Sequence, residues 1–349
     1  MQHQYVERSS GQIRTERLYG DRIVHHVFAG KREDSRIFYQ ALTSRRMTDF
    51  LAYVNFDSLL GARLCGSMRF MRGLGIDLRE CLDDPASFDT PRKVFERRIR
   101  YQEARLMPHD PEVIVSPCDA RLLVGNLSES MGLMIKDKLF DLDELLGPEN
   151  AGPFMDGQFA VLRLTPDKYH YNHCPVSGTV KDIYTLDGRY APCNPGCVIR
   201  LAQPYSKNRR VVTIIDSDCP GGSGSGLVAM VEVVALMIGE IVQAYSEHGY
   251  DRPTPVTPGM FLKRGQPKSL FRPGSSTVVL LFQKDRVVFD DDILRNQRRQ
   301  ARTRFSLGFG RAVVETEVWV RSGIARACPP GIRPHSDTNH ENRQTHTNR

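Results

Sequence analysis

Short runs of Val, Ile and Leu, separated by Gly, Pro, Asn and Asp, dominate the chain from about residue 113 to residue 289. Apolar runs of this length between turn residues predict β-strands. The runs are EVIVSP, FAVLRLTP, GCVIRLAQ, RRVVTIID, LVAMVEVVALMIG and TVVLLFQKDRVVF. Because few windows with helical spacing interrupt them, we expect a β-rich, mostly antiparallel catalytic body. Residues 290–327 predict one further helix pair or helix-strand unit.

The first 110 residues follow a different pattern. In ERLYGDRIVHHVFAG and LAYVNFDSLLGARLCGSMRFMRGLGI, apolar residues recur near helical spacing with Arg and Lys between them. We therefore expect an α+β protein with an amphipathic helical N-terminal region over residues 1–110, the catalytic domain over 111–328, and a disordered tail over 329–349. The apolar helical faces either pack on the main body or lie in a membrane interface.

Composition narrows the choice of partners and metals. The 349 residues carry a formal charge of +7, which suits an anionic membrane surface or nucleic acid. No interleaved basic and aromatic motif indicates nucleic acid, so we expect none. Eight cysteines without a secretory signal favour reduced thiols. Cys193 and Cys197 have no second Cys/His pair at zinc spacing, so we expect no metal.

The most apolar long window is GLVAMVEVVALMIGEIVQAY, residues 226–245. Glu232 and Glu240 interrupt it, and a bilayer core tolerates such residues poorly. We expect one or two core strands there and no membrane span.

Three stretches carry residues capable of chemistry. VSPCDARLLVG places Asp119 at the end of a strand, DKYHYNHCPVSGTV contains His170 and His173, and FRPGSSTVVLLF offers Ser275 and Ser276. A carboxylate, an imidazole and a hydroxyl can form a relay that activates the hydroxyl. Alternatively, the serines belong to an ordinary turn, and the two histidines are structural or bind a metal.

The order of these stretches resembles the phosphatidylserine decarboxylase family, whose members make their own pyruvoyl cofactor. VSPCDARLL is similar to the family's V-S-P-A-D-G-R, and DKYHYNHCPVSG to its D-Y-H-x-x-H-x-P-V-x-G. MIKDKLFDLDELLG, YTLDGRYAPCNPGCV and YSKNRRVV resemble the segments between and after them. GSSTVVLLFQKD stands where the family has its G-S-T processing site, and the similarity runs from about Tyr5 to Cys328.

The resemblance implies self-cleavage, in which a serine hydroxyl attacks the preceding carbonyl and the new N-terminal residue becomes a pyruvoyl group. By motif match, Asp119 and His173 form the relay that activates the serine. His170 lies near the pyruvoyl and assists proton transfer. The cofactor acts as an electron sink during decarboxylation, without a metal or pyridoxal phosphate.

Three departures from the family pattern stand out. The order Gly274, Ser275, Ser276, Thr277 leaves two registers for the processing site. Anchoring on STVVLLF makes Ser276 the pyruvoyl precursor and the Ser275–Ser276 bond the scissile one, whereas anchoring on Gly-Ser makes Ser275 the precursor. Ala120 replaces the usual Gly. GQPKSLF lacks the acidic residue and the second glycine of G-x-E-x-G-x-F.

The implied reaction converts phosphatidylserine to phosphatidylethanolamine and carbon dioxide. The implied partners are the phospholipid substrate, an anionic membrane on whose cytoplasmic side the enzyme is peripheral, and the second cleaved chain in a heterodimer, with a homodimer also possible. One alternative is decarboxylation of a free amino acid such as tryptophan. Others are an unprocessed, non-catalytic homologue and a serine hydrolase, which would lack the usual G-x-S-x-G elbow.

Overall fold

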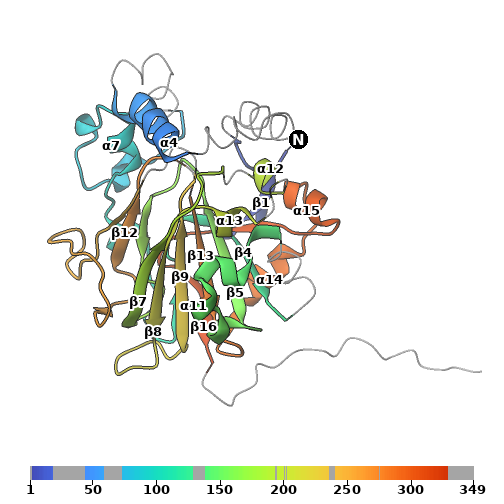
Figure 1. Ribbon diagram of the computed structural model, residues 1–349. Coiled ribbons are helices and arrows are strands. Elements are labelled where there is room, and N and C mark those ends of the chain that lie inside the picture. Colours follow the sequence, from blue (N-terminus) through green and yellow to red (C-terminus); the bar gives the residue numbers. More distant parts are fainter. Residues whose placement is uncertain are drawn as a thin grey trace, which may run out of the picture.

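A ten-stranded sheet is the centre of the protein. Figure 1 shows the computed structural model. The structure describes residues 2–18, 44–58, 73–128, 138–192, 195–199, 201, 203–235, 240–274 and 276–328. The strand order is β11-β7-β8-β9-β13-β5-β4-β15-β1-β2. In that order the strands are Phe261–Leu262, Gly178–Leu186, Arg210–Asp216, Leu227–Val233, Ser276–Phe282, Gln158–Leu164, Ala120–Asn126, Glu315–Val318, Gln4–Glu7 and Gln12–Thr15.

All pairings in this sheet are antiparallel except that of β1 with β15. Two three-stranded sheets complete the β structure. One has the order β10-β12-β6, with β10 Ile241–Gln243, β12 Pro267–Phe271 and β6 Tyr171–His173. The other has the order β14-β16-β3, with β14 Val287–Phe289, β16 Gly323–Ala327 and β3 Val113–Val115. The predicted β-rich, mostly antiparallel body is thereby confirmed.

The helices of the described residues are short. They are α4 Arg45–Ala52, α7 Pro91–Phe95, α8 Tyr101–Ala104, α10 Leu142–Leu146, α11 Pro148–Ala151, α12 Pro195–Val198, α13 Pro204–Lys207, α14 Asp291–Gln297 and α15 Arg304–Phe309. A π-helical turn, η1 Tyr53–Asp57, continues α4, and 3₁₀ turns occur at η2 Leu78–Glu80, η3 Pro85–Ser87 and η4 Gly152–Phe154. α4 and α7 lie close together above the upper ends of the strands in Figure 1.

Strand β13 lies between β9 and β5 and is buried on both faces. Its alternate residues enter two separate cores. Val278, Leu280 and Phe282 join one core, and Val279 and Leu281 join the other. Successive side chains of a strand point to opposite faces, so a strand covered on both sides needs an unbroken apolar run. This explains STVVLLF and fixes β13 firmly from its first residue.

Most predicted elements between residues 113 and 289 are confirmed. The window 226–245 contains β9 and β10, and the described residues include no helix long and apolar enough to cross a membrane. The strand predicted in GCVIRLAQ is wrong, because Pro195 opens the helical turn α12 instead. Proline fixes a helix-compatible φ at the first helical position, which overrides the weak signal of a short apolar run.

The ends of the chain need separate comment. Residues 4–15 form β1 and β2 of the main sheet, so the N-terminal region is not helical throughout. LAYVNFD belongs to α4 and η1, as expected for helix. Residues 19–43 and 59–72, which hold most of the other predicted helical segments, and the tail 329–349 lie outside the described residues. The expected unit over residues 290–327 consists of α14, α15, β15 and β16.

Candidate active site

The candidate site lies where the chain crosses twice between the large sheet and the β10-β12-β6 sheet. β5 ends at Leu164 and leads to β6, while β12 ends at Phe271 and leads to β13. Ser276, the first residue of β13, pairs with Leu164. The Phe271 amide donates to the His170 carbonyl oxygen at 3.1 Å. These two pairings bring the serine loop and the histidine segment to the same junction.

Ser276 is completely buried, and its hydroxyl has no hydrogen-bond partner among the described residues. A buried hydroxyl without a partner costs about 1–3 kcal/mol, so such a group calls for an explanation, of which a chemical role is one. Gly274, two residues earlier, has a φ of 152°. L-residues rarely adopt this value, so the turn into β13 requires glycine there. Ser275 lies outside the described residues, and the choice between the two serines stays a prediction.

His170 is also completely buried, and neither ring nitrogen has a hydrogen-bond partner in the described part of the chain. Its ring stacks on Phe95, with centroids 3.5 Å apart and planes at 27°. Burial, followed by the nearby positive charge of Arg97, holds the pKa of His170 well below its usual value. His170 is therefore neutral at pH 7, with one lone pair and one N–H available.

Helix α7 ends with Phe95. The helix forms here because Thr90 caps its N-terminus and Pro91 occupies its first position. Phe56 of η1 packs edge-on against Phe95, with centroids 6.2 Å apart. An Asp57 oxygen accepts a hydrogen bond from Nη2 of Arg92 in α7 at 2.6 Å. The N-terminal helical region thus contributes directly to the cover over His170.

Buried Arg97 joins this cover to the histidine segment. Its guanidinium donates to the Val94 carbonyl at 3.1 Å and to the Asp167 carbonyl at 2.9 Å. The first carbonyl belongs to α7 and the second to the turn that precedes His170. Arg97 therefore fixes the position of α7, which carries Phe95, relative to the turn that precedes His170.

His173 is held by two hydrogen bonds. Its Nδ1 lies 2.8 Å from the Gly265 carbonyl oxygen, and its Nε2 lies 3.0 Å from the Tyr169 hydroxyl. Because a carbonyl oxygen only accepts, Nδ1 carries the proton and Nε2 has the lone pair. Burial lowers the pKa of His173 to about 3. His173 is therefore a neutral imidazole whose Nε2 can accept a proton.

Asp119 is bound by other partners than the predicted one. Its carboxylate forms an ion pair with Arg105, at 3.0 Å between Nη2 and Oδ2, and accepts from the Val320 amide at 2.8 Å. The structure shows no Asp119–His173 hydrogen bond, since both ring nitrogens of His173 have the partners named above. The two segments are nevertheless adjacent, because the His173 amide donates to the Pro117 carbonyl at 2.7 Å. The relay in which Asp119 and His173 activate the serine therefore stays a prediction.

A buried ion pair that the sequence analysis missed lies behind β6. Lys268 Nζ is 2.7 Å from Glu232 Oε2, and both side chains are fully buried. Asn172 donates to the same carboxylate at 2.8 Å, and the Ser269 hydroxyl also bonds to it. The only sign of this ion pair in the sequence was that Glu232 and Lys268 each stand among uncharged residues. Ser269, which replaces the family's second glycine, thus has a partner for its hydroxyl.

The Ala120 departure has a simple explanation. Ala120 begins β4 and pairs with Val318 in extended conformation, completely buried. Glycine's special backbone freedom is not needed at an extended position.

One group of three possible metal ligands occurs in the described residues, namely His3, Glu16 and Glu315. Arg163 already pairs with both carboxylates, at 2.6 Å to Glu16 and 2.7 Å to Glu315. This cluster lies among β1, β5 and β15 and includes none of the predicted catalytic residues. The five described cysteines, Cys81, Cys118, Cys174, Cys219 and Cys328, are free thiols. Cys193 and the Cys197 side chain lie outside the described atoms.

Known proteins support the resemblance seen in the motifs. The sequence profile described as "Phosphatidylserine decarboxylase" matches residues 92–310. Phosphatidylserine decarboxylase proenzymes of Chlamydia trachomatis and Fusobacterium nucleatum are 30% and 28% identical to this chain, over 312 and 311 residues. The corresponding proenzyme of Ruminiclostridium cellulolyticum is 27% identical over 307 residues. Each alignment covers 87% of this chain and 95% of the relative. The chain belongs to the phosphatidylserine decarboxylase family.

Proposed function

We propose that this chain is a self-processing, pyruvoyl-dependent decarboxylase that converts phosphatidylserine to phosphatidylethanolamine and carbon dioxide. One observation carries the proposal beyond family membership. The hydroxyl of Ser276 and both ring nitrogens of His170 are buried at one junction without hydrogen-bond partners among the described residues. Groups in that state fit a serine that is to be consumed and an imidazole that is to exchange protons. When formed, the pyruvoyl group would supply an electron sink for decarboxylation.

In the processing step, the Ser276 hydroxyl attacks the carbonyl carbon of Ser275, the C–O bond of an ester forms, and the C–N bond breaks as the amine nitrogen takes the proton. Loss of the Cα proton of residue 276 then breaks its Cβ–O bond, which releases Ser275 as a carboxylate and leaves dehydroalanine. Water converts this dehydroalanine to the pyruvoyl group, and ammonia leaves. His173 is assigned the role of base, because its Nε2 carries the lone pair. Asp119 is assigned an electrostatic role. Burial is the main cause of the low pKa of His173, the charges of Arg321 and Arg105 lower it further, and Asp119 pairs with Arg105 and so offsets part of that charge. His170 is assigned to proton transfer during decarboxylation.

Cleavage before Ser276 would leave the small product firmly attached. β13 stays hydrogen-bonded to β9 on one side and β5 on the other. β15 and β16 of the small product also pair with β4 and β3 of the large one. These ladders support a heterodimer of the two cleaved chains.

Peripheral attachment to a membrane, on its cytoplasmic side, is proposed through α4 and η1. Phe50 and Tyr53 are each 60% exposed, and Met47 is 36% exposed. Arg45 and Arg46 precede them at the start of the helix. Exposed aromatic residues beside basic ones are typical of helices that lie in a membrane interface.

Intact-mass measurement, with and without hydroxylamine, tests the function. The expected products are residues 1–275 and a hydroxylamine-reactive fragment that begins at position 276. Ser276→Ala should give only the full-length chain, whereas Ser275→Ala should still be cleaved. The purified protein should release carbon dioxide from phosphatidylserine in mixed micelles and not from free tryptophan. A wild-type protein that stays full-length and does not react with hydroxylamine would overturn the proposal. Decarboxylation of tryptophan but not of phosphatidylserine would overturn the proposed substrate assignment.

A further inference from the structure

A basic pocket lies apart from the candidate active-site residues, where the start of α4 meets the two ends of the connection between β7 and β8. The cavity has a volume of about 470 Å³. The guanidinium groups of Arg45 and Arg209 face it together with Tyr190 and a single carboxylate, Asp187, whereas Arg189 borders it with a side chain that points away. Arginine side chains in excess of carboxylates favour an anionic ligand.

The guanidinium groups of Arg45 and Arg209 each have an ion-pair partner but make no hydrogen bond to a described residue. Arg45 lies 3.7 Å from Asp49, and Arg209 lies 3.7 Å from Asp187, both too far for a hydrogen bond. Arg163, by contrast, donates to two carboxylates at 2.6–3.0 Å. The pocket therefore offers N–H groups that a ligand can occupy.

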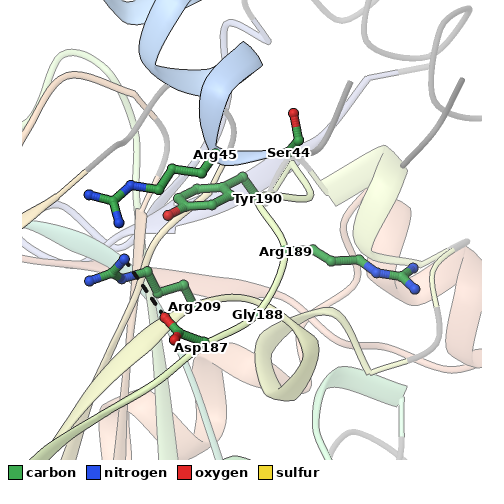
Figure 2. Close-up of a pocket in the computed structure, with 7 residues that line it drawn as sticks. All are labelled: Ser44, Arg45, Asp187, Gly188, Arg189, Tyr190 and Arg209. Atoms are coloured by element: carbon green, nitrogen blue, oxygen red, sulfur yellow. Dashed lines mark ion pairs between the residues drawn. The ribbon is translucent and has the colours of Figure 1, made fainter. Parts of the chain in front are cut away.

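Tyr190 adds an independent indication of a ligand. Its side chain is only 2% exposed and packs against Val234 and Ile241. Its hydroxyl has no hydrogen bond to a described residue, and Figure 2 shows it on the same side as the guanidinium groups of Arg45 and Arg209. In the same view the Arg189 side chain points the opposite way. Two guanidinium groups and one hydroxyl thus face a common space.

The backbone that presents these groups is fixed. A Cβ on Gly188 would lie 2.5 Å from the Lys207 carbonyl oxygen, so only glycine lets the two ends of the β7–β8 connection approach this closely. The Arg189 amide donates to that carbonyl at 2.8 Å, and the Arg209 amide donates to the Arg189 carbonyl at 3.0 Å. Asn208 bonds to both backbone groups of Ala191. The donors are therefore preorganised, which reduces the entropy lost on binding.

We propose that Arg45, Arg209 and Tyr190 bind the phosphate of an anionic membrane-lipid headgroup. Arginine forks match phosphate oxygens in paired hydrogen bonds, and a tyrosine hydroxyl adds one more donor. A lipid is the expected source because Arg45 belongs to α4, whose Phe50 and Tyr53 are exposed for insertion into an interface. The choice of a lipid rests on the proposed membrane function of α4.

Flotation with phosphatidylcholine vesicles that contain phosphatidylglycerol tests the pocket. Arg209→Ala should weaken binding about fivefold, the effect of one basic residue near an anionic surface. Tyr190→Phe, which keeps the buried ring and the charge, should weaken it measurably. Arg189→Ala is the matched control, since it removes the same charge from the adjacent chain but from a side chain that points away. It should change binding less than twofold.

Equal losses in Arg189→Ala and Arg209→Ala would show generic charge attraction and overturn the site. So would unchanged binding in Tyr190→Phe, a variant that should fold even if Arg209→Ala does not. Inorganic phosphate is titrated by calorimetry without vesicles. If Arg209→Ala abolishes phosphate binding but leaves vesicle binding intact, the lipid assignment is wrong. Pyruvoyl content and decarboxylation in mixed micelles, measured on the wild type and on Arg189→Ala, judge the proposed function separately.

Discussion

Acidification should destabilise this protein well before its carboxylates titrate, because two histidines are buried in neutral form. The perturbation is a change from pH 7 to pH 5. Burial depresses the pKa of His173 to about 3 and that of His170 well below its usual value. In the unfolded chain both imidazoles regain a pKa of about 6.5. Below pH 6.5 the unfolded state therefore binds more protons than the folded state does.

The sign and size follow from proton linkage. The contribution of each neutral histidine to the free energy of unfolding is fully present above the unfolded-state pKa of about 6.5. It is lost as the pH falls toward the folded-state pKa, at about 1.4 kcal/mol per pH unit for each proton. For His173 the loss at pH 5 is about 2 kcal/mol. His170 adds to it in the same direction. Glu315, whose pKa is lowered to about 2, contributes only below about pH 5, where the unfolded glutamate begins to protonate.

Denaturant unfolding followed by Trp319 fluorescence measures this loss. Trp319 is the single tryptophan, and it packs against Arg105 and Lys168 beside the site, with the charged groups 4.6 and 4.4 Å from its ring. The Ser276→Ala chain, checked to be intact by mass, avoids the unfolding of two separate chains. His173→Gln in that background titrates in neither state and should remove about one proton from the pH slope.

A free energy of unfolding that stays flat within about 1 kcal/mol between pH 6.5 and pH 5 would refute the reasoning. It would mean that the imidazoles are hydrated or paired in the folded protein. An unchanged slope in His173→Gln would refute the assignment to that residue alone.

Three further perturbations test the packing around the site. Lys268→Met leaves the Glu232 carboxylate buried without its ion pair, and denaturant unfolding should show a loss of about 3–5 kcal/mol; a loss under about 1 kcal/mol would contradict the burial of that pair. Phe95→Ala should cost about 3–5 kcal/mol and admit water to His170, so the pKa of His170 measured by NMR should rise. Gly157→Ala places a Cβ 1.9 Å from the Phe282 carbonyl oxygen and should lower the thermal midpoint markedly, whereas Gly152→Ala, at a position with open space, should not.

Local patterns predicted the strands and the order of the chemical groups. The unbroken apolar run of β13 and the motifs around Asp119, His170 and His173 are visible in the sequence because each lies within a few consecutive residues. The contacts among them are not. His173 is oriented by the Gly265 carbonyl, 92 positions away, and a backbone carbonyl leaves no trace in residue identity. That is why the sequence favoured Asp119 as the orienting group.

The cover over His170 was equally hidden. Phe95 ends a five-residue helix, and nothing near PRKVF indicates that its ring will stack on an imidazole 75 positions later. The Lys268–Glu232 pair, 36 positions apart, depends on β12 and β9 meeting behind β6. Short apolar runs also misled the assignment of GCVIRLAQ, where one proline decided the local conformation.

The division of the site between the two expected products constrains the order of events. With the proposed cleavage, Ser276 would begin the small product, whereas His170, His173 and the Gly265 carbonyl would belong to the large one. The strand pairings that bring them together, β13 with β5 and β12 with β6, join segments more than 90 positions apart. Pairings between segments so far apart in sequence form late and slowly in folding, because the entropy of closing the long loop must be overcome first. The groups assigned to processing therefore come together only in the folded, uncut chain, and we expect folding to precede processing.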